Sequence, residues 1–257
     1  MNKIIQDFEV SENLSINNAH FILKLNSPSE LPKIFPGQFA QVLIPDEITF
    51  LRRPFSIHDV NFQKNAISLF IKCVGEGTSR LRMLKKGDFI NILFPLGNSF
   101  GLNINSKALL IGDECGIAPL YYLAKCLHEK KIASDILIGA KSRNDIFLAE
   151  EFGKFCNVYF TTEDGSFGEK GLVRDHSILK NILSGYSKIY CSGSEQMIKA
   201  IASMAKMSDV DCEVSLEKNM ACGIGACLCC VTETVDGRKC VCTDGPVFNI
   251  KSLKWQI

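Results

Sequence analysis

The sequence lacks a long apolar segment, an export signal and an excess of charge of either sign. No stretch of the 257 residues approaches the roughly 18 apolar residues that a membrane-spanning helix needs. The start, MNKIIQDFEV, places Asp7 and Glu9 where an export signal needs an apolar run. The 29 basic and 28 acidic residues give no reason to expect nucleic acid or an anionic membrane as a partner. We therefore expect a cytoplasmic protein that binds neither membrane nor nucleic acid.

The sequence also has few residues that catalyse reactions by themselves. Its four histidines, His20, His58, His128 and His176, show no metal-ligand spacing, and we expect each to be a surface or core residue. We find no arrangement of a nucleophile with a base and no acid–base pair. We therefore predict no catalytic side chain, and any chemistry is expected to come from bound cofactors.

Cysteine, in contrast, is abundant. The chain has twelve cysteines, and in a reducing compartment they indicate metal or redox chemistry rather than disulfides. Six of them lie between Cys222 and Cys242. The other six are scattered, mostly in apolar stretches, and are expected to be small buried side chains. These six are Cys73, Cys115, Cys126, Cys156, Cys191 and Cys212.

The densest stretch, ACGIGACLCC, holds four cysteines in residues 221–230. Such crowding is compatible with a disulfide knot, a zinc site, a reactive thiol pair or an iron–sulfur cluster. From Cys222 the spacing is C-x4-C-x2-C, through Cys227 and Cys230, with Cys242 following after eleven residues. This is the plant-type pattern of a [2Fe–2S] cluster, in which a tight loop brings three thiolates to two irons and a distant cysteine completes the set.

Zinc is the main alternative for these cysteines. Structural zinc sites usually pair two C-x2-C knuckles, and only one is present unless Cys240 and Cys242 form a second pair at unusual spacing. A redox C-x-x-C would lie beside a strand–helix unit, whereas this one lies in a glycine-rich loop. Gly223 and Gly225 let the backbone curl close to inorganic sulfide. The spacing favours the cluster, with Cys229 and Cys240 as bystanders.

The patterning along the chain predicts three parts. Residues 1–103 read as six short strands of alternating polarity with one short helical piece, which indicates an antiparallel barrel. Residues 104–216 alternate buried strands with helices, which indicates a parallel sheet covered on both faces. Residues 217–257 form a glycine- and cysteine-rich module that is too small to fold without a stabilising cross-link such as a metal site or a disulfide. The predicted fold class is a β barrel followed by an α/β domain and a small [2Fe–2S] module.

Two fragments of the predicted barrel can bind a flavin nucleotide. Arg53 in the stretch RPFS can clamp a pyrophosphate, and the Ser56 hydroxyl can reach a ring nitrogen or carbonyl. Further on, Gly77 and Thr78 precede a short helix, whose free N–H groups offer an anion site. Either fragment alone reads as a strand edge or a turn. Their occurrence together, in this order and ahead of an α/β domain, argues against that reading.

These motifs resemble the ferredoxin–NADP reductase superfamily, which has PGQF, R-x-x-S and G-x-G-T in this order before a nucleotide-binding domain. Within it, the chain resembles from end to end the electron-transfer subunits of type B dihydroorotate dehydrogenases. The shared motifs include LRRP-x-SI, PLGN-x-F, DGS-x-G-x-KG, SLE, MACGIGAC and a DGPVF that follows the fourth cysteine. Related NADPH–ferredoxin transhydrogenase subunits have an aspartate at the first ligand position, where this chain has Cys222.

The resemblance implies two bound cofactors and a partner. It implies FAD held in the barrel by nine residues: Arg53, Pro54, Phe55, Ser56, Phe70, Ile71, Lys72, Gly77 and Thr78. It implies a [2Fe–2S] cluster on four thiolates: Cys222, Cys227, Cys230 and Cys242. Electrons would pass between NAD(H), FAD, the cluster and the FMN of a separate catalytic subunit in pyrimidine biosynthesis. The implied assembly is a heterotetramer of two copies of each subunit.

The nicotinamide half departs from the resemblance. Family members usually carry a turn close to GGGIGVAP, where residues 112–119 read GDECGIAP. Asp113 and Glu114 thus replace glycines that allow close approach of the ligand. Residues 191–194 read CSGS where a C-G-P element is expected. We predict weakened NADH binding; the alternative is a turn that binds NADH in a shifted pose.

Two other functions remain compatible with the sequence. One is a general NAD(P)H–acceptor reductase that feeds ferredoxin or a sulfur compound. The other is a non-catalytic module on the same scaffold whose cluster senses redox state. Bound FAD would distinguish the redox-sensing module from an electron-transfer subunit, because a sensor can dispense with FAD and an electron-transfer subunit cannot.

Overall fold

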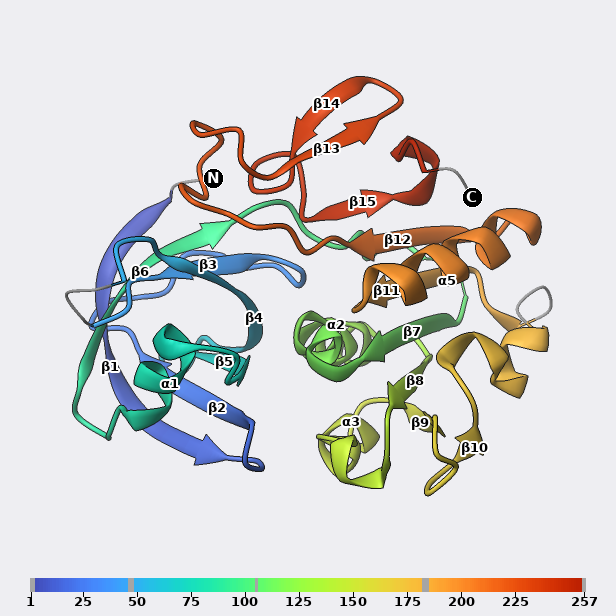
Figure 1. The fold of residues 1–257 in the computed structure, drawn as a ribbon, viewed down its shortest axis with the longest axis horizontal. Helices are drawn as coiled ribbons and strands as arrows, with labels where there is room; N and C mark the ends of the chain where they lie inside the picture. The colour runs from blue at the N-terminus through green and yellow to red at the C-terminus, as the bar shows by residue number, and fades with distance from the viewer. Residues whose placement is uncertain (1–2, 46–48, 105, 182–184, 256–257) are drawn as a thin grey trace.

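The computed structural model describes residues 3–45, 49–104, 106–181 and 185–255. Figure 1 shows a barrel on one side, a sheet with helices on the other, and a small module that lies over both. This arrangement confirms the predicted fold class. Each part is built by local patterns that the sequence already shows.

The barrel is closed, antiparallel and six-stranded, with the strand order β1-β2-β5-β4-β3-β6. Its strands are β1 Ile4–Ser15, β2 His20–Asn26, β3 Phe39–Val42, β4 Arg53–Asn61, β5 Ala66–Lys72 and β6 Phe89–Leu96. Side chains that alternate along each strand fill the interior, as Ala40 and Val42 do from β3. The short helix α1, Glu76–Met83, follows β5. The predicted short helix is therefore confirmed.

The second part is a seven-stranded sheet with the order β10-β9-β8-β7-β11-β12-β15. Its strands are β7 Ala108–Asp113, β8 Ser134–Ala140, β9 Asn157–Thr162, β10 Glu169–Lys170, β11 Lys188–Ser192, β12 Asp211–Ser215 and β15 Val247–Asn249. All neighbouring pairs are parallel except β12 with β15. The central strands β7, β8 and β11 are buried along nearly their whole length, as expected for a sheet covered on both faces.

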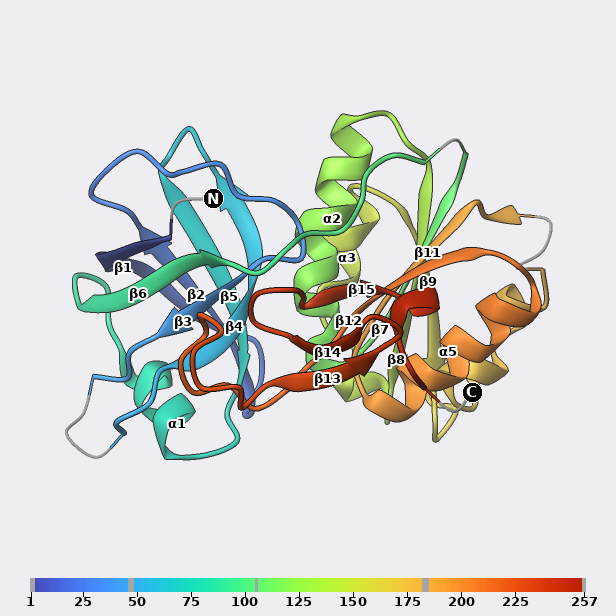
Figure 2. The same ribbon diagram turned by 90° about the horizontal axis from the view of Figure 1, so that it is seen from above.

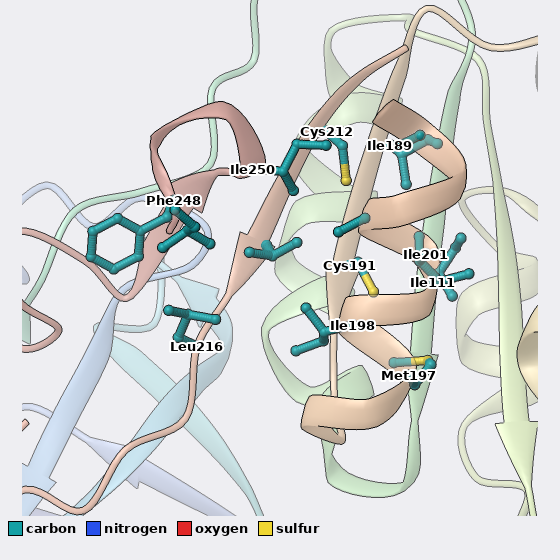
Figure 3. Close-up of a cluster of buried hydrophobic side chains, with 14 of the residues drawn as sticks. Ile111, Ile189, Cys191, Met197, Ile198, Ile201, Cys212, Leu216, Phe248 and Ile250 are labelled. Carbon is teal, nitrogen blue, oxygen red and sulfur yellow. The ribbon is translucent and has the colours of Figure 1, made fainter. Parts of the chain in front are cut away.

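Helices cover both faces of this sheet. Helices α2, Ala118–Glu129, and α3, Ala149–Gly153, lie on the face toward the barrel, and α5, Glu195–Met207, lies on the opposite face (Figure 2). Ile198 and Ile201 of α5 pack on Ile111 of β7 and Ile189 of β11 (Figure 3). Tyr122 of α2 reaches the barrel core, and its hydroxyl donates to the Ile34 carbonyl at 3.1 Å. No helix in the described ranges is long and apolar enough to cross a membrane.

The cysteine-rich module contributes a hairpin and the last strand of the large sheet. The hairpin pairs β13, Val231–Thr234, with β14, Gly237–Cys240. Strand β15 then pairs antiparallel with β12, and Phe248 packs beside Leu216 (Figure 3). The sequence did not predict this edge strand, because three residues are too few to show a period. The module is thus anchored on the sheet by backbone pairing as well as by its apolar side chains.

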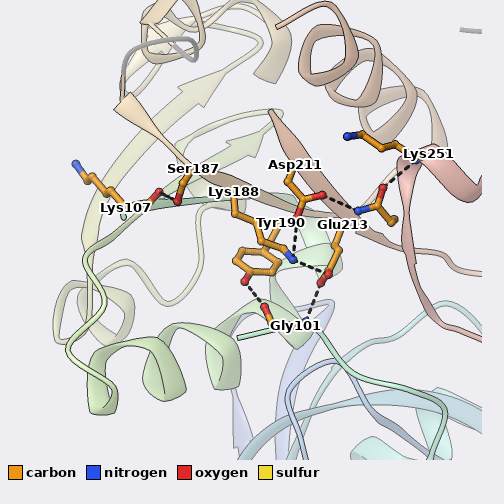
Figure 4. A network of polar contacts seen from close by, with 9 residues as sticks. Gly101, Lys107, Ser187, Lys188, Tyr190, Asp211, Glu213 and Lys251 are labelled. Atoms are coloured by element: carbon orange, nitrogen blue, oxygen red, sulfur yellow. Dashed lines mark hydrogen bonds and ion pairs between the residues drawn. The ribbon is translucent and has the colours of Figure 1, made fainter. Parts of the chain in front are cut away.

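A buried ion-pair network joins the barrel to the sheet where the chain passes between them. Lys188 of β11 is within 2.6 Å of Glu213 and 3.1 Å of Asp211 on β12 (Figure 4). Burial opposes its charge, but the hydrogen bonds and charges of these two carboxylates outweigh it and raise the pKa of Lys188. Glu213 also accepts from the Gly101 N–H at 2.8 Å, and the Tyr190 hydroxyl donates to the Gly101 carbonyl. These contacts fix the connection between the two parts.

The six scattered cysteines are buried or half-buried, and three of the four histidines are buried. All twelve cysteines lie in the described part of the chain and are free thiols. Cys191 and Cys212 are fully buried, and burial raises the pKa of Cys115 and Cys156 to about 12. His58 is buried between β4 and α2, where burial lowers its pKa to about 4. The interpretation of these residues as core side chains is confirmed for Cys191, Cys212 and His58.

Candidate functional site

A cleft of about 880 Å³ lies where the three parts of the molecule meet. Phe55 and Ser56 of β4 line it from the barrel, and Gly116 lines it from the turn after β7. Met220 and Pro246 line it from the cysteine-rich module. Its volume is that of a site for a large cofactor, and all three parts of the chain can contact one bound molecule.

The structure brings together seven of the nine predicted flavin residues in this cleft. The seven lining residues are Pro54, Phe55, Ser56, Phe70, Ile71, Lys72 and Thr78. The other two do not line it: the Arg53 side chain donates to the Leu51 carbonyl at 2.9 Å, and a Cβ added at Gly77 would lie 3.4 Å from the Ile44 side chain. The lining combines an aromatic side chain with hydroxyls and a cation, a set that suits an isoalloxazine ring with its pyrophosphate.

Thr78 shapes the loop that leads into α1. Its hydroxyl accepts from the N–H groups of Val74 at 2.9 Å and Gly75 at 3.1 Å, and it donates to the Gly75 carbonyl at 3.0 Å. These bonds hold residues 74–78 as a tight turn on the cleft, with Val74 and Thr78 both in its lining. The first turn of a helix carries N–H groups without intrahelical partners, so this end of α1 is suited to an anion.

Asp113 ends β7 and contacts the start of α5 across the sheet. Its carboxylate accepts from the Ser194 N–H at 2.8 Å and from the Ser194 hydroxyl at 2.5 Å. Ser194 is the residue that caps the N-terminus of α5. At Gly193, where φ is +147°, an added Cβ would lie 1.9 Å from an Asp113 oxygen. The acid that replaces a glycine of the family turn therefore accepts hydrogen bonds from Ser194, just beyond the carboxyl end of β11.

Glu114 reaches in the other direction, across the cleft. Its carboxylate lies 2.5 Å from the ammonium of Lys72 on β5 and 3.9 Å from that of Lys141. The hydrogen bond from Lys72 lowers the pKa of Glu114, and the same bond raises the pKa of Lys72. Glu114 holds a left-handed backbone conformation with φ of +43°. A predicted flavin residue and an acid of the nucleotide turn thus form one ion pair.

A second, smaller pocket lies beyond this turn. It measures about 170 Å³ and lies at the carboxyl ends of β7, β8 and β9, the position at which open α/β sheets bind ligands. Thr161, Lys141, Arg174 and Gln196 line it. None of these four residues was predicted from the sequence. Lys141 directly follows β8, and Thr161 lies near the end of β9. A polar residue at the carboxyl end of a strand is the sequence signal that could have identified them.

Cys222 and Cys227 form the first pair of cluster cysteines. The N–H groups of Ile224 and Cys227 both point at the Cys222 sulfur, each at 3.4 Å. These donors, Ile224 first, lower the pKa of Cys222 to about 6 and so favour its thiolate form. Gly225, with φ of +85°, allows the tight loop between the two cysteines. The loop is thus arranged to stabilise a sulfur anion.

Cys230 and Cys242 form the second pair. Both are buried at 1% exposure, and the Cys242 N–H points at the Cys230 sulfur at 3.4 Å. Burial, followed by the hydrogen bond with Cys230, raises the pKa of Cys242 to about 12 while both are thiols. Cys240 also contacts Cys230, whereas Cys229 is exposed.

The pairing of these cysteines fits a two-iron cluster. Backbone N–H groups join Cys227 to the Cys222 sulfur and Cys242 to the Cys230 sulfur. A [2Fe–2S] cluster with four cysteine ligands requires two thiolates at each iron.

Comparisons with known proteins agree with this geometry. The family described as "Oxidoreductase FAD-binding domain" matches residues 6–100, and the "Iron-sulfur cluster binding domain of dihydroorotate dehydrogenase B" matches residues 217–254. Among solved structures, one titled as an NADH-dependent reduced ferredoxin-NADP oxidoreductase superposes with a TM-score of 0.87 at 28% identity, covering 96% of this chain and 90% of that one. A ferredoxin reductase of carbazole 1,9a-dioxygenase shares the fold, with a TM-score of 0.71 at 19% identity over 82% of this chain and 67% of that one.

Curated relatives match over nearly the whole chain. The protein from Caldanaerobacter subterraneus subsp. tengcongensis is 39% identical, covering 84% of this chain and 85% of that one. The protein from Fusobacterium nucleatum subsp. nucleatum is 36% identical, covering 95% of this chain and 96% of that one. Both are named "Dihydroorotate dehydrogenase B (NAD(+)), electron transfer subunit". With its flavin cleft, its paired cysteines and these relatives, the chain belongs to the family of electron transfer subunits of dihydroorotate dehydrogenase B.

Proposed function

We propose that this protein passes electrons between NAD(H) and the FMN of a dihydroorotate dehydrogenase catalytic subunit, by way of its own FAD and [2Fe–2S] cluster. The observation that carries the proposal is the placement of the cysteine-rich module. Met220 and Pro246 of this module line the same cleft as Phe55 and Ser56 of the barrel. A flavin in the cleft and a cluster in the module would therefore be neighbours.

The residues proposed to hold the cofactors keep the assignments made from the sequence. FAD would be held by Arg53, Pro54, Phe55, Ser56, Phe70, Ile71, Lys72, Gly77 and Thr78. The cluster would be held by Cys222, Cys227, Cys230 and Cys242. When bound, the flavin supplies two-electron exchange with a nicotinamide and one-electron exchange with an iron–sulfur carrier.

The protein's own groups would bind and orient the two cofactors and exclude water from them. Ser56 offers a hydroxyl to the edge of the ring system, and Phe55 offers an aromatic face. On the cluster side, the N–H groups of Ile224 and Cys227 stabilise the Cys222 thiolate. The burial of Cys230 and Cys242 keeps water from that half of the cluster. These roles need no acid–base side chain.

The family supports a proposal for the partner, and the cysteines support one for the compartment. We propose an FMN-containing catalytic subunit as the partner, in a heterotetramer with two copies of each subunit. We place the protein in the cytoplasm, because cluster cysteines must be reduced and all twelve cysteines are free thiols.

Reconstitution with a dihydroorotate dehydrogenase catalytic subunit tests the proposal. Anaerobic addition of dihydroorotate to the mixed subunits should reduce the flavin and the cluster of this chain, and omission of the catalytic subunit should prevent it. The mass of the mixture should correspond to two copies of each subunit. A chain that holds both cofactors, reduces ferredoxin with NADH and ignores the catalytic subunit would support a general reductase instead.

A further inference from the structure

Gln41 of strand β3 is a buried polar side chain without a partner. It is fully buried, at 0% exposure. Within the described part of the chain, neither its amide nitrogen nor its amide oxygen has a hydrogen-bond partner. A buried amide that makes no hydrogen bond destabilises a fold, so its presence indicates that something else contacts it.

The strand geometry shows which way Gln41 points. Successive side chains of a strand point to opposite faces. Ala40 and Val42 fill the barrel interior, so Gln41 and Phe39 point outward. Phe39 packs in the same apolar cluster as Cys230 and Cys242. The outward face of β3 is therefore covered by the cysteine-rich module, and Figure 2 shows the loop before β13 reaching over this strand.

Gln41 lies against the loop that holds the first pair of cysteines. An added Cβ at Gly223 would lie 2.9 Å from the Gln41 amide nitrogen and 2.7 Å from its Cγ. Gly223 directly follows Cys222 and has a φ of +69°. A larger residue at 223 would thus meet both backbone strain and the Gln41 side chain. The amide is held beside Cys222, where the N–H groups of Ile224 and Cys227 already point at sulfur.

We propose that the Gln41 amide N–H donates a hydrogen bond to a sulfur atom of the [2Fe–2S] site, on the Cys222 side, and thereby raises the reduction potential of the cluster. The inference rests on the cluster assigned under the proposed function. Sulfide and thiolate are anions that accept hydrogen bonds, and only the N–H end of the amide can satisfy them. Gln41 is a positioning residue that acts through the cluster and is not a ligand.

The direction of the effect follows from charge. One-electron reduction adds negative charge to the sulfur atoms, so a donated hydrogen bond stabilises the reduced form more than the oxidised form. Removing the donor therefore makes reduction harder. The donor also comes from the barrel, which places a flavin-domain side chain in control of the potential of the acceptor next to the flavin.

The test is the variant Gln41→Met, which keeps the size of the side chain and removes its N–H. The fully loaded protein is titrated with reductant at set potentials, and the reduced cluster is followed by its EPR signal. We expect the equilibrium constant for reduction to fall about tenfold, which is a downward shift of about 59 mV for one electron. In protein with glutamine labelled by ¹⁵N at the side-chain amide, pulsed EPR should show a nitrogen coupling that Gln41→Met abolishes.

Gln38 provides the matched control. It is also fully buried, three residues away, but its amide accepts from the Phe35 N–H at 2.8 Å and donates to the Gly97 carbonyl at 3.0 Å. Gln38→Met should lower the free energy of unfolding and leave both the potential and the nitrogen coupling unchanged. If Gln41→Met fails to assemble a cluster, Gln41→Asn is the second variant. Its side chain is shorter by one methylene, so its amide lies farther from the cluster. The reduction potential should then fall by less than in Gln41→Met.

Two results overturn the inference. One is a cluster potential that is the same in wild type, Gln41→Met and Gln41→Asn. The other is a nitrogen coupling that survives in Gln41→Met. Iron and acid-labile sulfide are measured first in every variant. A wild-type protein without the cluster refutes the proposed function itself, whereas an intact cluster with an unmoved potential refutes only the role of Gln41.

Discussion

The two walls of the cleft differ in the carboxylates that they carry. The barrel wall, which includes Phe55, Ser56 and Thr78, presents the residue types of the family's flavin motifs to the cleft, and its described lining residues include no carboxylate. The nucleotide wall, which includes Asp113, Glu114 and Ser194, makes hydrogen bonds and ion pairs within the chain, one of them between Glu114 and Lys72 of the barrel wall. An anionic cofactor thus meets carboxylates on the nucleotide wall and none in the described lining of the barrel wall.

The Asp113 and Glu114 carboxylates of the nucleotide wall lie at the end of β7 and in the turn that follows it, where the family turn has glycines. A carboxylate near the N-terminus of a helix is stabilised by the same N–H groups that attract a phosphate. Asp113 occupies the Ser194 N–H in this way. An unscreened like charge about 4 Å from a pyrophosphate costs about 4 kcal/mol at an effective dielectric constant of 20. A phosphate that took the Ser194 N–H would displace this carboxylate, whereas the described lining of the barrel wall holds no carboxylate.

The largest expected effect concerns the module that closes the cleft. Replacement of any one of the proposed ligands, Cys222, Cys227, Cys230 or Cys242, by serine should abolish the visible absorption of the cluster, because each iron needs two thiolates. Cys229→Ser is the control and should leave the absorption intact, since Cys229 is exposed. Loss of absorption in Cys240→Ser with retention in Cys242→Ser would show that the second pair is Cys230 with Cys240.

The next effect concerns the contact that fixes the nucleotide wall to the barrel. His58 of β4 contacts the Ala118 carbonyl through Nδ1 at 3.0 Å, directly after the nucleotide turn. Its pKa falls from the ordinary 6.5 to about 4 in the folded protein. Between these two pH values His58 is protonated in the unfolded chain and neutral in the folded protein. The free energy of unfolding therefore decreases as pH falls from 6.5 towards 4, by about 3 kcal/mol in total.

Urea unfolding between pH 4 and pH 8 measures this effect. His58→Gln keeps a donor for Ala118 and does not titrate, so its unfolding free energy should vary less over this range than that of the wild type. The exposed His128→Gln is the control and should retain the wild-type dependence. Equal pH dependence in wild type and His58→Gln would show that the two walls are not joined through this histidine.

The third effect tests the barrel wall. Arg53 donates to the Leu51 carbonyl, and a phosphate is a stronger, charge-assisted partner than a carbonyl. Arg53→Ala should lower FAD affinity about ten- to hundredfold, because such a contact contributes roughly 1.5–3 kcal/mol. The measurement is flavin release followed by fluorescence.

The neighbouring arginine is the matched control for Arg53. Arg52 donates to the Gln41 and Asn91 carbonyls at 3.2 and 3.1 Å. Arg52→Ala should therefore reduce stability and leave flavin affinity nearly unchanged. Unchanged FAD affinity in Arg53→Ala would mean that the pyrophosphate lies elsewhere on the barrel wall.

The smallest effect tests the nucleotide wall. We predict that the protein binds NADH weakly, and that Asp113→Gly combined with Glu114→Gly tightens binding about tenfold, if about 1.4 kcal/mol of repulsion survives screening. NADH affinity is measured by titration with flavin fluorescence as the signal, at low and at high salt. Salt should reduce the difference in NADH affinity between the wild type and the double variant. The single variants separate two effects: Asp113→Gly frees the donors of Ser194, and Glu114→Gly frees the ammonium of Lys72. Tight NADH binding that the double substitution leaves unchanged would show that the acids do not oppose the nucleotide.

The sequence predicts most of the fold because the patterns are local. Alternation in β1 to β6 and the apolar runs of β7 to β9 follow from neighbouring residues. The choice of Cys222, Cys227, Cys230 and Cys242 as cluster ligands rests on their spacing and on the family resemblance, and it stays a prediction. The bonds of Asp113 with Ser194 do not follow from neighbouring residues, because 81 residues separate the two along the chain. Gln41 reads as an ordinary polar position of a half-exposed strand, and only the packing of the module over β3 shows that it is buried.

The central claim is that one chain holds a flavin and a [2Fe–2S] cluster in electronic contact. An anaerobic titration with dithionite, followed by visible absorption and EPR, tests it most directly. The protein should take up about three electrons per chain, two on the flavin and one on the cluster, with two irons and two acid-labile sulfides per chain. An uptake of only two electrons without an EPR signal, in protein that contains zinc in place of iron, would contradict the claim.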